Sequence, residues 1–223
     1  MQYLHFLWSV KLPEDHFAHF VDWIEDLHLV GVQFGIGTSR ENKNQFARFY
    51  DAKTGKETQL FDFEDRIDAF AYSPKSKRIA VGEGDGTVSL FSIQPLKKVF
   101  TVPAHRHKLQ RIVFAPDGKS FATASTDGVI QVWDIEKGKN LAELKGHKNN
   151  VNSMAISADS KLLISAGSDI SLRFWNLESK KQLTRVDQLY DFSVNTLSLS
   201  PDEKWLAVGG ANQSDAKLFQ LRK

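Results

Sequence analysis

Short runs of alternating apolar and polar residues follow one another along this chain. One example is Arg111–Phe114, which the turn-forming residues Ala115–Lys119 separate from a second run, Ser120–Ser125. Alternation with a period of two is typical of half-buried strands, and Pro, Asp and Gly between two such runs favour a hairpin turn. No window keeps the 3.6-residue period of an amphipathic helix. The pattern therefore predicts an almost entirely β protein.

Both the turn and the strand that follows it recur at a fixed distance. Four turns share one design: SPKSK from Ser73, APDGK from Ala115, SADSK from Ser157 and SPDEK from Ser200. Five segments of the chain each end in a short predicted strand that carries an aromatic residue. These residues are Tyr50, Phe91, Trp133, Trp175 and Phe219, and they are spaced by 41, 42, 42 and 44 positions. A period of this size indicates a repeat architecture, here of four short antiparallel strands per repeat.

Gly-His precedes one repeat at His147, and Trp-Asp closes the third strand of another at Trp133. Together with the period, these features resemble the WD40 family of β-propellers. The resemblance covers essentially the whole chain, and the first repeat is assigned mainly on spacing. It implies one all-β propeller domain over residues 1–223, with repeats at about 11–54, 55–94, 95–136, 137–178 and 179–223.

The resemblance also implies a role for the histidines. In WD40 blades, a His from the entry loop, a Ser or Thr on the second strand, an Asp in the next turn and the Trp indole form a hydrogen-bonded chain. Such a chain satisfies buried polar groups, so these residues are architecture and not catalysis. The third repeat supplies His105, Thr123, Asp127 and Trp133, and the fourth supplies His147, Ser165, Asp169 and Trp175. The second repeat keeps Asp85 but has Val81 and Phe63 at the other polar positions, and the fifth has Tyr190 at the histidine position.

Only five repeats are recognisable, whereas propellers typically have about 4 to 8 blades. The run Tyr3–Val10 belongs to no repeat. We expect residues 2–10 to complete the last blade as its outer strand, which closes a ring of about five blades. The alternative is an open ring to which a partner or a second copy adds blades.

Composition narrows the class of protein. The 223 residues include no cysteine, which excludes disulfides, thiolate nucleophiles and Cys-ligated metals. The N-terminal run lacks the basic region and cleavage site of a secretory signal, and no apolar stretch is long enough to span a membrane. We therefore expect a soluble, intracellular, cytoplasmic protein.

Several patterns resemble catalytic or metal-binding motifs only superficially. Gly82–Thr87 is glycine-rich but lies between two strands, whereas a dinucleotide fingerprint requires a strand and then a helix. His16 and His19 are three residues apart near Asp15, a spacing that a polar loop explains as well as a metal does. No HExxH, GxSxG or Walker A motif occurs. We expect no enzyme, no cofactor and no metal site.

Partner binding is expected on the face that carries the entry loops and the turns between second and third strands, because loops on a rigid scaffold commonly bind. Two insertions on this face, Gly37–Phe46 and Gly209–Ala216, would form one polar ridge if the ring closes. The candidate partner-binding residues are Arg40, Glu41, Lys43, Asp65, Arg66, Arg106, His107, Lys108, Lys148, Asn149, Tyr190, Asn212 and Gln213.

The turns at the opposite end are rich in lysine, including Lys180 and Lys181, but acidic residues are interspersed and the net charge is only +2. The sequence favours a non-catalytic protein-interaction scaffold, either a subunit or a recognition module of a larger complex. The alternative is a nucleic-acid or phospholipid adaptor that binds through the lysine-rich face.

Overall fold

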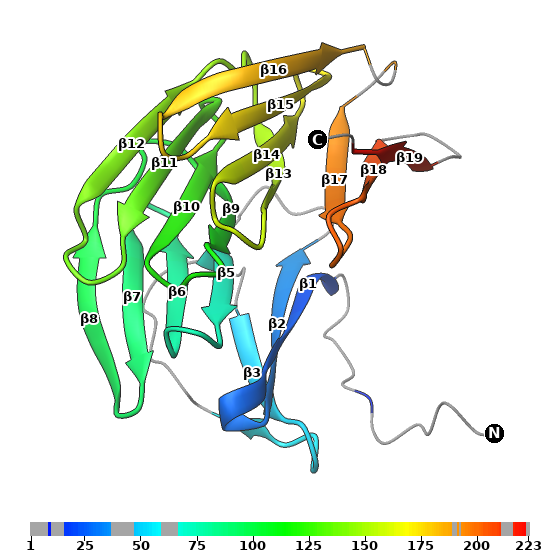
Figure 1. Ribbon diagram of the computed structural model, residues 1–223. Coiled ribbons are helices and arrows are strands. Elements are labelled where there is room, and N and C mark those ends of the chain that lie inside the picture. Colours follow the sequence, from blue (N-terminus) through cyan, green and yellow to red (C-terminus); the bar gives the residue numbers. More distant parts are fainter. Residues whose placement is uncertain are drawn as a thin grey trace. The chain divides into compact units, whose positions relative to one another are not determined.

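The computed structural model describes residues 9, 16–36, 47–58, 67–188, 191, 193–210 and 216–221. The chain forms two compact units, Met1–Ile67 and Asp68–Lys223, and each is described by itself. Strands dominate both units (Figure 1). Within the described ranges the helical structure is the 3-10 turn Glu25–Leu27, and no helix there could cross a membrane.

Unit 1 contains one antiparallel sheet whose strands lie in chain order, and we call it blade 1. Its strands are β1 (His16–Ile24), β2 (Leu29–Ile36), β3 (Ala47–Asp51) and β4 (Glu57–Thr58). Ile24, Leu29, Phe49 and Tyr50 are buried in this unit.

Unit 2 contains four further antiparallel sheets, each with its strands in chain order. We call them blades 2 to 5. Blade 2 consists of β5 (Ile67–Ser73), β6 (Arg78–Glu83), β7 (Val88–Ile93) and β8 (Leu96–Val102). Blade 3 consists of β9 (Leu109–Phe114), β10 (Ser120–Ser125), β11 (Val129–Asp134) and β12 (Asn140–Lys145). Blade 4 consists of β13 (Val151–Ile156), β14 (Leu162–Gly167), β15 (Ser171–Asn176) and β16 (Lys181–Asp187). Blade 5 consists of β17 (Val194–Leu199), β18 (Trp205–Gly210) and β19 (Ala216–Gln220).

The core of unit 2 lies between successive blades. Leu90 of blade 2 packs in one cluster with Leu109 and Phe121 of blade 3. Ile130 of blade 3 packs in the next cluster with Leu163 of blade 4. The middle strands of blade 3 are therefore covered on both faces, which explains why β10 is buried along nearly its whole length. Burial of each large aliphatic side chain contributes about 1.5–3 kcal/mol, so the blades of unit 2 are stabilised mainly by the neighbours they pack against.

The observed sheets confirm the fold that the sequence predicts: an all-β chain of five propeller blades with three or four antiparallel strands each. Each sheet is offset by one strand from the sequence repeats. For example, β8 lies inside the repeat 95–136 but pairs with β7 of blade 2.

Blade 5 has three described strands, and the outer edge of β19 has no neighbour among the described residues. Of the run expected to complete it, Tyr3–Val10, the structure describes Ser9 alone, so this closure stays a prediction. We expect amide hydrogens of β19 that do not pair with β18 to be protected from exchange in the full chain. Deleting residues 2–10 should remove this protection while leaving blade 3 protected, and equal exchange in both proteins would contradict the closure.

Candidate functional site

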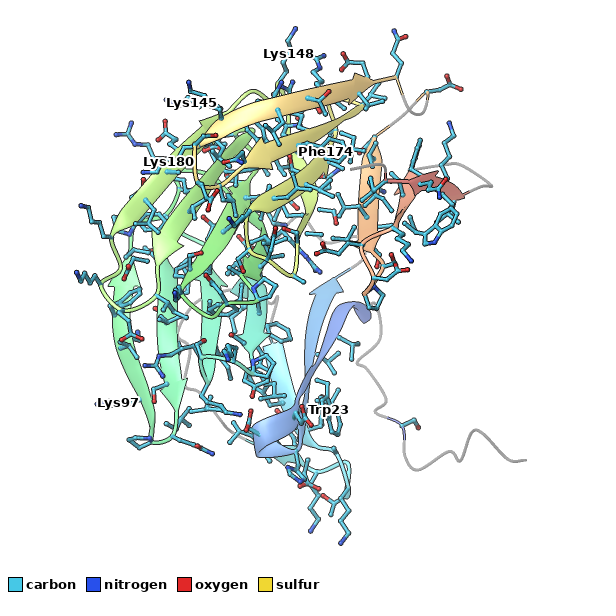
Figure 2. The ribbon with its side chains drawn as sticks, viewed as in Figure 1. Trp23, Lys97, Lys145, Lys148, Phe174 and Lys180 are labelled. Atoms are coloured by element: carbon cyan, nitrogen blue, oxygen red, sulfur yellow. The ribbon has the colours of Figure 1, made fainter. Side chains whose placement is uncertain are left out.

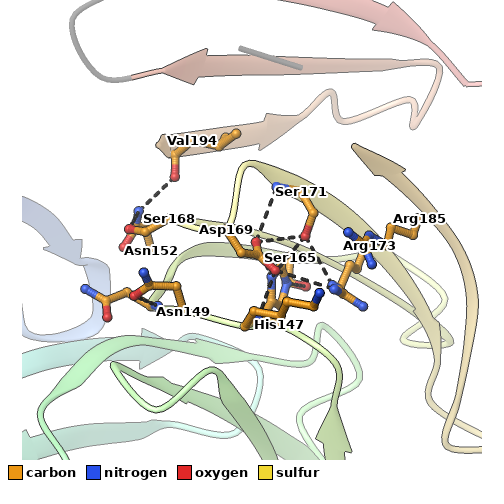
Figure 3. A network of polar contacts seen from close by, with 12 residues as sticks. His147, Asn149, Asn152, Ser165, Ser168, Asp169, Ser171, Arg173, Arg185 and Val194 are labelled. Carbon is orange, nitrogen blue, oxygen red and sulfur yellow. Dashed lines mark hydrogen bonds and ion pairs between the residues drawn. The ribbon is translucent and has the colours of Figure 1, made fainter. Parts of the chain in front are cut away.

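Four polar side chains of blade 4 meet in a continuous network, and Figure 3 labels three of them, His147, Ser165 and Asp169. His147 lies in the loop after β12, Ser165 on β14, Asp169 in the β14–β15 turn and Trp175 on β15. The His147 Nε2 atom is 2.7 Å from Ser165 Oγ, and its Nδ1 atom is 2.9 Å from Asp169 Oδ1. The Trp175 Nε1–H group donates to Ser165 Oγ at 2.8 Å. The structure thus brings together the four residues that the fourth repeat offers.

The direction of these hydrogen bonds follows from what each group can donate. An ionised carboxylate only accepts, so the His147 Nδ1–H group donates to Asp169. In the neutral ring, Nε2 then accepts a hydrogen bond from the Ser165 hydroxyl group. The Ser165 oxygen in turn accepts a hydrogen bond from the indole N–H of Trp175. Each group has one complementary partner on each side, which fixes the entry loop and the turn against the sheet.

Ser165, His147 and Asp169 share the connectivity of a Ser-His-Asp catalytic triad, yet their burial gives them another role. Ser165 is fully buried, and the His147 side chain has no exposed surface. The Trp175 indole also occupies the serine oxygen, which a nucleophile would need free for attack. The hydrogen bonds of these buried side chains join the entry loop, the β14–β15 turn and the two middle strands of blade 4.

The blade 4 network extends beyond the four predicted residues to a buried arginine. Arg173 is 3% exposed; it donates to Gln182 Oε1 on β16 at 2.7 Å and lies 3.4 Å from Asp169 Oδ2. Asp169 also accepts from Ser171 and from the Lys148 N–H. Burial alone would raise the pKa of Asp169, but hydrogen bonds from His147, Lys148 and Ser171 outweigh it and hold that pKa well below its usual range. Asp169 therefore stays ionised opposite Arg173.

Blade 3 has a shorter version of the same network. The His105 Nε2 atom is 2.9 Å from Thr123 Oγ1, and Trp133 Nε1–H donates to the same oxygen at 3.1 Å. The His105 Nδ1 atom lies 3.6 Å from Asp127 Oδ2, beyond a normal hydrogen bond. Gln131 occupies the position that Arg173 has in blade 4, since each faces the second-strand hydroxyl residue across the sheet.

Because His105 is buried and its contact with Asp127 is weak, we expect the free energy of unfolding to depend on pH through this residue. Burial lowers the pKa of His105, and the Asp127 carboxylate opposes only part of this effect. Because the unfolded state then binds a proton more readily than the folded state, the free energy of unfolding should rise with pH up to about 6.5 and level off above it. Urea unfolding at several pH values should show this rise in the natural protein and a smaller one in His105→Gln. Equal slopes would contradict the assignment.

The described residues of blade 2 do not form this network, because one of its polar positions carries an apolar side chain. Asp85 accepts from the N–H and hydroxyl of Thr87, but Val81 stands on β6 where blades 3 and 4 have a hydroxyl group. Here Ser89 donates to Glu83 and pairs with Thr101 on β8. Phe63 lies outside the described residues.

The turns between second and third strands differ at one residue. Gly86 and Gly128 follow the turn aspartates at φ values of 88° and 80°, whereas Ile170 takes this position in blade 4 at φ 62°. A β-branched residue in this left-handed region is strained by about 1–2 kcal/mol.

We expect Ile170→Asn to raise the free energy of unfolding by about 0.5–1 kcal/mol, because Asn tolerates the left-handed region. The control Ile170→Val keeps the β-branch and should bring no gain. Thermal unfolding of the two variants makes the comparison, and a loss of stability in Ile170→Asn would contradict strain at this turn.

The predicted partner-binding residues divide into two groups. Arg106, His107, Lys108, Lys148 and Asn149 lie exposed in the entry loops of blades 3 and 4, and Figure 2 shows Lys148 projecting away from the strands. The remaining candidates lie outside the described residues: Arg40, Glu41, Lys43, Asp65, Arg66, Tyr190, Asn212 and Gln213.

Sequence reasoning missed two polar links. Besides the Arg173–Gln182 bond, Asn152 Nδ2 on β13 donates to Ser193 Oγ and the Val194 carbonyl of blade 5, both at 2.9 Å. Asn152 stands at a register shift of β13, where an extra residue points out of the ladder. A repeat alignment places polar Gln110 and Asn195 at the same shifts of β9 and β17, and that recurrence was the available signal.

No group of side chains in the described part of the chain could hold a metal ion. The side chains of His16 and His19 are not among those described, so that metal hint stays untested.

The fold and the networks together define a repeat β-propeller, in which successive blades reuse one polar chain to fix their loops. Comparison with protein families agrees. The model "Anaphase-promoting complex subunit 4 WD40 domain" matches residues 70–155, and the model "WD domain, G-beta repeat" matches residues 138–176 and 183–217. The chain belongs to the WD40-repeat family of β-propellers. None of the curated proteins matched it.

Proposed function

We propose that this chain is a non-catalytic scaffold whose entry loops in blades 3 and 4 hold a protein partner within a larger complex. WD40 propellers are generally protein-interaction scaffolds, and one matching family is named for a domain of a complex subunit. The main structural support comes from three cations on the entry loops. Arg106, Lys108 and Lys148 are exposed, have no acidic partner among the described residues, and stand on loops fixed by the buried networks.

A rigid loop loses little conformational entropy when a partner binds, which favours affinity. The cations on these loops favour an acidic partner surface. The predicted cytoplasmic location is part of the same proposal and rests on the cysteine-free composition.

Native mass spectrometry of the protein purified gently from its own source tests the proposal. We expect a stoichiometric complex heavier than the 25.2 kDa chain. The triple change Arg106→Ala, Lys108→Ala and Lys148→Ala should dissociate this complex, whereas the matched change Lys137→Ala, Lys139→Ala and Lys180→Ala should leave it intact. A bare chain, or equal loss with both triples, would refute the proposed surface.

A further inference from the structure

Unit 2 has a second charged surface at the end opposite its entry loops. Two sets of turns lie there, those that join first to second strands and those that join third to fourth strands, because the strands alternate in direction. The Asp117 N–H donates to Ser160 Oγ, and the Ala158 N–H donates to Glu203, so turns of consecutive blades are neighbours. We call this end the lysine face. Its lysines are Lys75, Lys77, Lys97, Lys98, Lys119, Lys137, Lys139, Lys161, Lys180, Lys181 and Lys204.

Acidic side chains at this end are held against the turns. Asp117 accepts from the Lys119 N–H, Asp134 accepts from the Lys137 N–H, and Asp202 accepts from the Lys204 N–H. These hydrogen bonds keep the three short carboxylate side chains close to the backbone. Two glutamates are paired in ion pairs, Glu136 with Arg78 and Glu178 with Lys161.

Most of the lysines, in contrast, point to solvent. Seven are exposed and have no acidic partner in the described part of the chain: Lys75, Lys97, Lys119, Lys137, Lys139, Lys180 and Lys181. Figure 2 shows Lys97 and Lys180 projecting away from the strands. Since a lysine stem is longer than an Asp side chain, an approaching surface meets ammonium groups before it meets carboxylates. Although the net charge of the chain is only +2, the outermost charged groups of the lysine face are thus mainly positive.

Two large apolar side chains lie exposed at the same end. Leu96 begins β8 and is 42% exposed, and Trp205 begins β18 and is 41% exposed. Leucine and tryptophan beside lysines are the residue types that enter the headgroup boundary of a bilayer.

We propose that the lysine face of unit 2 docks on an anionic membrane surface. Nucleic acid fits this face less well for two reasons. In the described part of this end, the Arg78 fork, which would suit phosphate and base edges, is not free, because Arg78 donates to the Ser76 and Lys77 carbonyls and pairs with Glu136. Trp205 is a single exposed ring at this end of the described chain, whereas single strands need several rings for stacking. Compact ammonium groups suit a diffuse layer of charged headgroups.

Sedimentation of the full chain with vesicles tests this proposal. We expect binding to vesicles of phosphatidylcholine with phosphatidylserine, none to phosphatidylcholine alone, and loss of binding at high salt. The triple reversal Lys137→Glu, Lys139→Glu and Lys180→Glu should weaken binding by about a hundredfold or more, given the contribution of each lysine near the surface. The control Arg106→Glu, Lys108→Glu and Lys148→Glu changes the net charge equally on the opposite end and should retain most of the affinity. Circular dichroism confirms that both variants fold.

Three results would overturn the proposal. These are no binding to the anionic vesicles, equal loss in the two triple variants, or binding to a single-stranded RNA homopolymer without binding to vesicles. The last result would assign the face to nucleic acid. Because the test uses a different end of the molecule from the entry loops, its outcome is independent of the protein-scaffold proposal.

Discussion

Replacing Asp169 by Asn lowers the free energy of unfolding by about 3–5 kcal/mol, the largest effect that we expect from a single polar substitution. The Asp169 carboxylate faces donors on every side: His147 Nδ1, Ser171, the Lys148 N–H and Arg173. An amide would turn its own N–H groups toward some of these donors. It would also leave the Arg173 guanidinium, 3% exposed, without a counter-charge.

Blade 3 supplies the matched control. Asp127→Asn should cost only about 1 kcal/mol, because the Asp127 side chain is 24% exposed and no buried arginine faces it. Adding Arg173→Gln to Asp169→Asn gives blade 4 the residue of blade 3 and should recover part of the loss. Urea unfolding at neutral pH measures all three proteins. Equal costs for the two aspartates would mean that the buried Arg173 does not set the difference.

Gly86→Ala is expected to lower the free energy of unfolding by about 3 kcal/mol. Gly86 has a φ of 88°, and its carbonyl accepts the His105 N–H at 2.9 Å. A Cβ atom there would lie 2.2 Å from the His105 carbonyl oxygen, which is backbone and cannot swing aside. The entry loop of blade 3 must then shift, and His105 with it.

Gly118→Ala separates the backbone collision from conformational strain. Gly118 also has a positive φ, 72°, but its added Cβ would meet Lys75 Cγ, part of a flexible side chain, at 2.9 Å. Ser160 and Glu203 already adopt this conformation in the equivalent turns of blades 4 and 5. We expect a cost of about 1 kcal/mol for Gly118→Ala in the same unfolding experiment. A similar loss in both variants would show that the contact with His105 is unimportant.

The sequence predicts most of this fold because its signals are local and repeated. Turn residues such as Pro116 and Gly118 mark hairpins, and the aromatic period places Trp133 and Trp175 on equivalent strands. The positions of His147 and Asp169 then follow from the Gly-His pair and the turn.

What the sequence does not predict depends on contacts between strands or blades. The Arg173–Gln182 bond needs the β15–β16 register, and the Asn152 bonds need blade 5 to lie against blade 4. Arginine is rarely buried without a partner, so residue type alone does not place Arg173 in the interior of blade 4. The ridge expected from Arg40 and Asn212 rests on residues 37–46 and 211–215, which lie outside the described residues, so it stays a prediction.

The bond from His105 to Gly86 has a consequence for how binding spreads through the protein. The His105 side chain belongs to the network of blade 3, and its backbone N–H donates to the Gly86 carbonyl in a turn of blade 2. This residue therefore links the two blades. We therefore expect a partner bound at the Arg106 loop to suppress local opening in both blades, and this effect should become weaker with each further blade. Blades linked in this way behave as a one-dimensional array, in which the stability of each blade is coupled to that of its nearest neighbours. We thus expect binding at one blade to change local opening in that blade and its immediate neighbours, and not in distant blades.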